Sequence, residues 1–134
     1  MQDRVSKLVL GAAQFRFEGP IGPRGRTPQA ETAEILSVAQ RAGIELLDAA
    51  VPYPSAETVI GEAMPKPHKF RVMVKAARCD RGPDFVEAEA RASLRRLGVQ
   101  KGAAIIVQSA GDLFGPHGPA LWDKLQDLKD QSLF

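Results

Sequence analysis

The chain has 134 residues, 44% of them hydrophobic and 25% charged, which is the composition of one soluble globular domain over residues 1–134. Its 18 basic and 16 acidic side chains leave a formal net charge of +2, too balanced to favour nucleic acid or a membrane surface as a partner. No stretch approaches the ~18 apolar residues of a membrane helix. The single cysteine, Cys79, excludes an internal disulfide, so a reducing compartment fits and we expect the cytoplasm.

The first predicted strand covers residues 8–13 (LVLGAA). Its apolar run is broken by Gly11 and Gln14, so we interpret it as part of the mature fold rather than as a signal sequence. A loop rich in glycine and proline follows at residues 18–26 (EGPIGPRGR).

The first predicted helix begins at Thr27 and Pro28, because threonine can cap free N–H groups and proline is tolerated at the first helical position. Gly43 ends it, where a left-handed residue is usual. Apolar residues at helical spacing predict its buried side. They are Ala33, Ile35, Leu36, Val38, Ala39 and Ala42.

Three further strand and helix pairs follow. The predicted strands cover residues 44–48, 70–75 and 103–108. Ser55 can cap the second helix, which Pro65 and Pro67 stop, and Pro83 or Asp84 starts the third, which Gly98 ends. We expect Phe85, Ala88, Leu94 and Leu97 on the inner side of the third helix. The last helix starts at about Gly118, with Leu121, Leu125, Leu128 and the neighbouring Trp122 packed on the sheet.

The order of elements is therefore β-α-β-α-β-α-β-α, and the strands are short and mostly apolar throughout. Such strands are typical of a parallel sheet that is covered on both faces by helical crossovers. Two α/β architectures fit the pattern: an open doubly wound sheet, or a stretch of (β/α)₈ barrel. A full barrel needs roughly 250 residues, so the chain could supply about half of one.

Polar side chains follow three of the strands, at the end where barrel enzymes place their catalytic residues. They are Asp48, Lys75 and Gln108, and Tyr53 follows in the same loop as Asp48. Tyrosine is a poor acid, with a reference pKa around 10, but a nearby ammonium group lowers that pKa. An aspartate paired to the lysine would hold the ammonium in place, and the tyrosine could then protonate a carbonyl oxygen as a hydride reaches the carbon. The plainer alternative is that Asp48 pairs with Lys75 and caps nearby backbone.

Four stretches carry a resemblance to the aldo-keto reductases: LVLGAAQF, LLDAAVPYPSAE, FRVMVKA and IIVQSAGDL. Asp48 and Tyr53 match that family's second loop, as do Ser55 and Glu57, the latter one residue later than usual, and Lys75 matches the lysine after the third strand. The resemblance implies half of a (β/α)₈ TIM-type barrel, and an oxidoreductase that reduces small aldehydes or ketones. It implies NADP or NAD as cofactor, with Gly11, Ala12 and Asp48 near the nicotinamide.

The sequence departs from the family in two places. Gln108 stands where the family has a histidine after the fourth strand; its amide can still donate a hydrogen bond but cannot carry charge or relay a proton. The sequence given ends before the family's fifth strand, and most of the family's cofactor contacts come from the second half. We therefore expect a truncated half barrel that self-associates or pairs with a complementary C-terminal half; a truncated product that is only marginally folded is the third outcome. The alternative is a catalytically silent regulator or scaffold that binds a protein partner.

Other reactive side chains are ambiguous. His68 precedes the third strand and is expected on the surface. His117, in the turn after the fourth strand, could stand in for the missing histidine, although a surface residue at a helix start is the better interpretation. Arg78 and Arg81 could lower the pKa of the Cys79 thiol, although a plain loop cysteine is the better interpretation because the sequence places no base for it. No spacing typical of a metal site is present.

Overall fold

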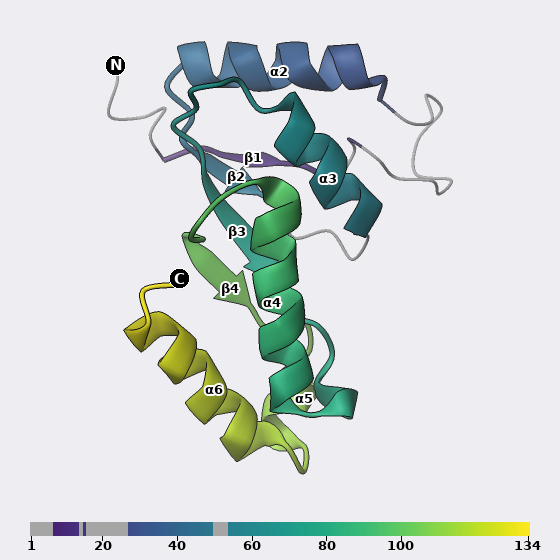
Figure 1. Ribbon diagram of the computed structural model, residues 1–134, viewed down its shortest axis with the longest axis vertical. Coiled ribbons are helices and arrows are strands. Elements are labelled where there is room, and N and C mark those ends of the chain that lie inside the picture. Colours follow the sequence, from purple (N-terminus) through teal and green to yellow (C-terminus); the bar gives the residue numbers. More distant parts are fainter. Residues whose placement is uncertain (1–6, 14, 16–26, 50–53) are drawn as a thin grey trace.

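Four parallel strands and their helices make up the fold in a computed structural model, which describes residues 7–13, 15, 27–49 and 54–134 (Figure 1). The strands pair in the order β1-β2-β3-β4, so each is a neighbour of the next one in the chain. Their bounds are β1 (Val9–Gly11), β2 (Leu46–Asp48), β3 (Arg71–Lys75) and β4 (Ala104–Ile106). The predicted α/β fold of four βα units is confirmed.

One long helix follows each strand. These helices are α2 (Gln29–Arg41), α3 (Pro54–Ala63), α4 (Pro83–Leu97) and α6 (Gly118–Asp130). Two short elements lie in segments interpreted as loops from the sequence: the 3₁₀ turn η1 (Cys79–Arg81) after β3, and α5 (Ala110–Phe114) after β4. The predicted loop over residues 18–26 lies outside the described residues.

The helices cover one face of the sheet. Leu47 is paired with Val72, and Val74 with Ile105, so these four side chains share a face. Leu47, Val72 and Val74 are fully buried in a single core. The same core contains residues from three helices: Leu36 and Ala39 of α2, Ile60 and Ala63 of α3, and Leu94 and Leu97 of α4.

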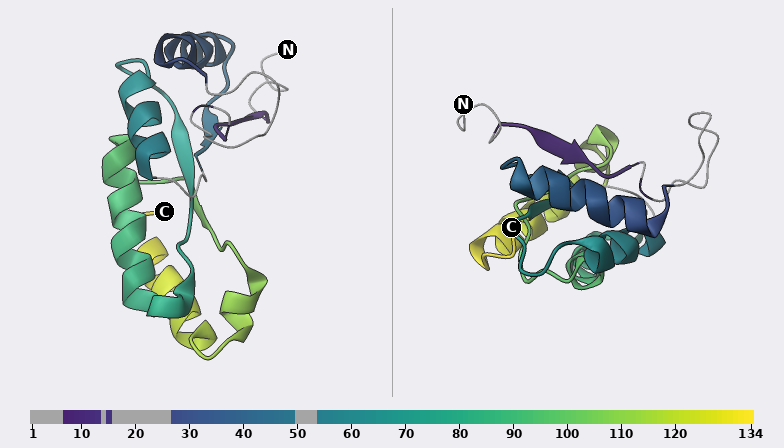
Figure 2. Two further views of the ribbon diagram at one scale, coloured as in Figure 1. Left: turned by 90° about the vertical axis from the view of Figure 1, so that its right-hand side faces the viewer. Right: turned by 90° about the horizontal axis from the view of Figure 1, so that it is seen from above.

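The alternate residues of the strands form an inner face that no helix of the described chain covers. Along β3, Val72 and Val74 are buried, whereas Met73 and Lys75 are half-buried and Arg71 is exposed. The expectation of strands covered on both faces is therefore wrong for these residues. In Figure 2, α3 and α4 lie on one side of β3, and α2 and α3 on one side of β1. A doubly wound sheet has helices on both faces, so the arrangement is that of half a (β/α)₈ barrel.

Glycines end the helices as predicted, and the helix starts differ by one or two residues. Gly43 and Gly98 have φ values of 88° and 71°, in the left-handed region that favours glycine. Pro28 immediately precedes α2 rather than starting it, and no side-chain cap is present at that position. Ser55 lies inside α3 rather than capping it. Helix ends commonly shift by this much, because terminal turns are weakly held.

Three predicted apolar stripes are only partly buried. In α2, Leu36 and Ala39 are buried, but Val38 is 49% exposed. In α4, Leu94 and Leu97 are buried as predicted, but Val86 and Ala90 are buried in place of Phe85 and Ala88. In α6, the predicted leucines are buried as expected, but Trp122 is 54% exposed. Helical periodicity identifies the apolar side of a helix but does not say which of its residues contact another helix or strand.

Helices α3 and α4 approach closely at a glycine. A Cβ atom on Gly61 would lie 2.5 Å from the carbonyl oxygen of Arg96, so only glycine fits there without movement. Nearby, the Arg96 guanidinium donates a 2.6 Å hydrogen bond to the Glu57 carboxylate, whose side chain is only 5% exposed. Glu57 therefore joins the two helices.

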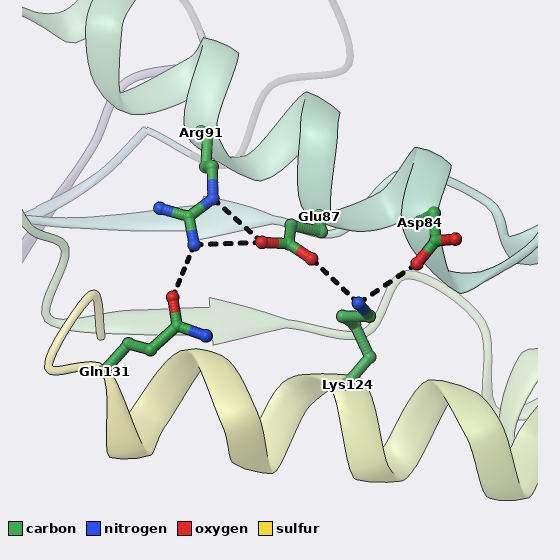
Figure 3. Close-up of polar contacts among 5 residues, drawn as sticks. All are labelled: Asp84, Glu87, Arg91, Lys124 and Gln131. Atoms are coloured by element: carbon green, nitrogen blue, oxygen red, sulfur yellow. Dashed lines mark hydrogen bonds and ion pairs between the residues drawn. The ribbon is translucent and has the colours of Figure 1, made fainter.

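Helices α4 and α6 are joined by a chain of polar contacts along their exposed edge (Figure 3). The Lys124 ammonium donates to Glu87 at 2.8 Å and lies 3.0 Å from Asp84, which is almost fully exposed. Arg91 bonds to the other oxygen of Glu87 and to the side-chain oxygen of Gln131. Hydrogen bonds from Lys124 and then Arg91 lower the pKa of the Glu87 carboxyl, and the bond to Glu87 raises the pKa of Lys124.

Candidate active site at the carboxyl ends of the strands

The carboxyl ends of the four strands meet at one edge of the sheet. Asp48 ends β2 and is paired with Met73, two residues before Lys75 ends β3. Since side chains alternate along a strand, Met73 and Lys75 share a face, and Asp48 lies on that face with them. This is the open inner face. Two of the three residues predicted from strand ends, Asp48 and Lys75, are therefore neighbours on adjacent strands, one diagonal step apart.

Backbone hydrogen bonds continue past these strand ends and fix their positions. The Ala12 N–H donates to the Asp48 carbonyl at 2.9 Å, and the Ala49 N–H donates to the Met73 carbonyl at 3.1 Å. The Ala76 N–H donates to the Ile106 carbonyl at 2.8 Å. The residues at this edge are thus held by the sheet rather than by loop conformation alone, which suits a site that needs defined geometry.

Asp48 and Lys75 are both half-buried. The ion pairs between described residues do not include one between them, so the expected pairing of Asp48 with Lys75 is not observed. Asp48 has another interaction within the chain. Gln108 is exposed and lies two residues beyond β4, at the same edge. Tyr53, the fourth predicted catalytic residue, lies outside the described residues.

The three residues expected near a nicotinamide differ in accessibility. Gly11 is exposed, and a Cβ placed there would meet no atom within 4 Å. Ala12 is fully buried; its N–H is bonded to Asp48, and its carbonyl accepts from Phe15 at 3.1 Å. Gly11 and Asp48 are paired on adjacent strands, and the backbone of the buried Ala12 is hydrogen-bonded to that of Asp48.

An ion pair joins the loops that follow β3 and β4. Arg78 donates two hydrogen bonds from Nε and Nη2 to the Asp112 carboxylate, at 2.9 Å and 3.1 Å. The bond from Arg78 lowers the pKa of Asp112 and raises that of Arg78. This ion pair was not predicted from the sequence. Ser109 followed three residues later by Asp112 is a pattern typical of a helix start, and it could have indicated α5.

Cys79 lies behind this ion pair and is buried, with 3% of its surface exposed. Burial, and then the negative charge of Asp112, raises the pKa of its thiol. The idea that neighbouring arginines lower this pKa is therefore wrong: Arg78 is turned to Asp112, and the Arg81 guanidinium lies 3.8 Å from the centre of the Phe85 ring. A buried thiol with a raised pKa is a poor nucleophile.

The two histidines lie apart from Asp48 and Lys75 in the chain and in their contacts. His117 is exposed at the start of α6, as expected for a surface residue. His68 is half-buried before β3 rather than on the surface, and its ring lies 6.3 Å from that of Phe70.

Within the described residues, no three side chains of the types that bind metals cluster together. In the same part of the chain, no helix combines the length and apolar character needed to cross a membrane.

Comparison with known proteins identifies the family of this site. The family model for the aldo/keto reductase family matches residues 7–130, nearly the whole chain. The chain belongs to this family. No curated protein sequence matches it.

Solved aldo-keto reductase structures share the fold. The PA4992 protein of Pseudomonas aeruginosa, assigned to the aldo-keto reductases, superposes with a TM-score of 0.77 at 23% identity, over 93% of this chain and 51% of its own. An aldo-keto reductase from Bombyx mori in complex with NADP has a TM-score of 0.65 at 19% identity, over 94% of this chain and 43% of its own. The aldose reductase of Schistosoma japonicum has a TM-score of 0.61 at 17% identity, over 93% and 46%. The chain therefore spans about half the length of these aldo-keto reductases.

Proposed function

We propose that the carboxyl edge of the sheet is the N-terminal part of an oxidoreductase site that reduces small aldehydes or ketones with NAD(P)H. A second set of four βα units would complete the barrel around it. The observation that carries the proposal is the position of Asp48 and Lys75 on one face of adjacent strands, at the edge where barrel enzymes hold their catalytic residues. Membership of the aldo/keto reductase family supports it.

Each residue of the set has a chemical task in this proposal. A bound reduced nicotinamide would supply the hydride that adds to the carbonyl carbon and would leave oxidised. The Tyr53 hydroxyl would donate a proton to the carbonyl oxygen, which gives an alcohol. The Lys75 ammonium would stabilise the resulting phenolate, with Asp48 orienting that ammonium. The Gln108 amide would donate a hydrogen bond that orients the carbonyl.

The described residues fit only the nicotinamide end of such a cofactor. Gly11 leaves open space at the end of β1, and Asp48 lies beside it on the next strand. The Bombyx mori aldo-keto reductase is in complex with NADP, and we propose NADP or NAD as the cofactor of this chain, with residues beyond those described supplying the contacts to the phosphates. Residues at the edge would then hold the ring, while the second set of units holds the rest.

Gln108 supports a second candidate function, that of a catalytically silent relative that binds a protein partner. An amide cannot take up a positive charge as a carbonyl is polarised, and Gln108 is exposed after β4. Such a protein would keep the fold and lose the turnover. The two candidates make opposite predictions for the variant Gln108→His.

The test is titration of the purified chain with NADPH and NADH, followed by nicotinamide fluorescence, with the mass in solution measured on the same sample. Saturable binding supports the oxidoreductase proposal for this chain, whereas no binding up to millimolar cofactor would mean that the chain alone is a fragment or a scaffold. Gln108→His should raise the rate of aldehyde reduction by about tenfold or more, because losing a well-placed donor typically costs 10²–10³ in rate. Tyr53→Phe, the matched control, should remove about 10²–10⁴ of the rate in either background and leave cofactor affinity unchanged. A Gln108→His variant that binds cofactor without turnover would favour the silent relative.

A further inference from the structure

The segment after β4 carries Gln108 and then forms the short helix α5. None of the residues of α5 is buried, and its last residue, Phe114, is 88% exposed. The start of α5 has no side-chain cap, and its Leu113 packs against the hydrophobic cluster around Leu121. So short a helix is unstable by itself in water, because its first turn fixes several residues for a single hydrogen bond. Burial therefore accounts for little of what holds this segment in place.

The Asp112 carboxylate ties α5 to the segment that follows β3. Its side chain is 10% exposed and accepts hydrogen bonds from Nε and Nη2 of Arg78, at 2.9 Å and 3.1 Å. The backbone N–H of Cys79 donates to the same carboxylate at 3.4 Å. Forked bonds between a guanidinium and a carboxylate are among the stronger hydrogen bonds in proteins and also fix an orientation. All of these donors belong to one segment, so the contact joins two loops rather than two ends of one loop.

This ion pair lies close in the chain to two residues of the candidate site. Arg78 comes three residues after Lys75, and Asp112 comes four residues after Gln108. Before Gln108, the strand pairing of Lys75 with Ile106 holds β4 against β3. After Gln108, the ion pair holds α5 against the same partner segment. The backbone of Gln108 is thus attached to the β3 side at both of its ends.

Strand alternation indicates the face on which Gln108 lies. Ile106 is paired with Lys75 and shares the inner face with it. Ile105 and Val107 pack against the cluster around Leu121, on the helix side of the sheet. Because successive side chains point to opposite faces, Gln108 is expected to follow Ile106 onto the inner face. A movement of α5 would therefore shift Gln108 relative to Lys75, and a misplacement of about 1 Å can cost as much as 10² in rate.

We propose that Arg78 and Asp112 are positioning residues whose ion pair fixes Gln108 on the inner face beside the end of β3. Neither side chain contacts the substrate in this arrangement, and both act through Gln108. The consequence for the rate rests on the proposed oxidoreductase function. The consequence for the order of the segment after β4 does not, so the two can be tested separately.

The first measurement is the NMR order parameter of the backbone amides of residues 108–112 in the full chain. In Asp112→Asn, which keeps the shape of the side chain and removes its charge, these values should fall from about 0.85 to below about 0.6, while those of α3 stay unchanged. Asp84→Asn is the matched control, because it removes a carboxylate from the ion pair with Lys124 elsewhere on α4 and should leave residues 108–112 ordered. Unchanged order parameters in a folded Asp112→Asn variant would overturn the proposal.

Variants of Arg78 test whether the two side chains act as one unit. Arg78→Ala should loosen residues 108–112 as Asp112→Asn does, and the double variant should loosen them no further, because both changes remove the same interaction. Arg78→Lys keeps the charge without the forked geometry and should recover only part of the order. Effects that add in the double variant would show that the two residues act independently, which contradicts the proposal.

The rate of aldehyde reduction with NADPH tests the consequence for the site. Asp112→Asn should lower kcat by about tenfold and leave the dissociation constant of NADPH unchanged. In a Gln108→Ala background the same change should cost no further rate, because the side chain that it positions is gone. An equal loss in both backgrounds would mean a structural role alone and would overturn the link to Gln108. A chain that binds no NADPH counts against the proposed function, while the order parameters still decide whether the ion pair positions Gln108.

Discussion

The two faces of the sheet contrast sharply although they are made of the same strands. On the outer face, Leu47 and Val72 are fully buried beneath the helices. On the inner face, their neighbours Leu46 and Met73 are half-buried, and Asp48 and Lys75 stand beside them. The outer face holds the fold together through burial of apolar surface. The inner face can carry polar side chains because it contributes less to that core. Along one strand, the residues that stabilise the fold therefore alternate with the residues that are available for a site.

The largest expected effect separates the two faces directly. Leu47→Ala should lower the free energy of unfolding by about 2–5 kcal/mol, because it leaves a cavity in a sealed core. Leu46→Ala, the matched control one residue earlier, should cost less than about 1 kcal/mol at concentrations where the chain is monomeric. Urea unfolding of the two variants measures both values. Equal losses would mean that the inner face is covered in the single chain, and would break the comparison.

A second, smaller effect concerns how tightly the outer layer is packed. Gly61→Ala should destabilise the fold by about 1–3 kcal/mol, because the new methyl group would press on the backbone of α4 near Arg96. Gly111→Ala in α5 is the control: the nearest atom to its Cβ would be the Ser109 hydroxyl at 3.4 Å, an ordinary contact. Thermal unfolding should show a lower midpoint for the first variant and no loss for the second. A harmless Gly61→Ala would show that α3 and α4 can move apart at little cost.

The smallest expected effect lies at the exposed edge between α4 and α6. The pKa of Glu87 is lowered in the folded chain from its usual 4.5, so the folded state binds fewer protons than the unfolded state near that pH. Its contribution to stability is therefore complete above pH 4.5 and is lost as the pH falls through the lowered pKa. The pKa of Lys124 is raised, so its own contribution is complete below about pH 10.5 and is lost only as the pH rises through the raised value.

Unfolding of the unmodified chain and of Glu87→Gln should accordingly differ most at neutral pH and converge in acid. Lys124→Met should remove most of the same contribution, so the double variant should lose less than the sum of the two single losses. Chemical unfolding at several pH values measures this. A difference that is constant from neutral pH to acid would show that Glu87 acts through packing rather than charge.

Much of the fold could be predicted from the sequence because its signals are local. Apolar runs gave the four strands, and Gly43 and Gly98 marked helix ends since their backbone conformation favours glycine. What the local pattern could not give is which apolar residues find a neighbour. Val38 was predicted on the buried side of its helix and Trp122 on the sheet, yet they are 49% and 54% exposed, because helical spacing does not say which apolar residue has a neighbour.

The candidate site was predictable to the same degree. Asp48 and Lys75 were found because the ends of parallel strands meet at one edge, and pairing of the strands places them there. The burial of Ala12 and Cys79 could not be foreseen, since it depends on contacts between segments distant in sequence. From the sequence, Arg78 was expected to act on the adjacent Cys79, whereas in the structure its guanidinium is hydrogen-bonded to Asp112 after the next strand.

The strand order has a consequence for how the chain acquires its shape during synthesis. Because β1, β2, β3 and β4 pair strictly in sequence order, each of β2, β3 and β4 finds a partner strand already synthesised when it leaves the ribosome. Among these four described strands, each pairing joins strands that are separated by a single helical connection. Short separations between contacting segments favour rapid folding. The strands of the nascent chain can therefore add to the sheet in the order of their synthesis, one βα unit at a time.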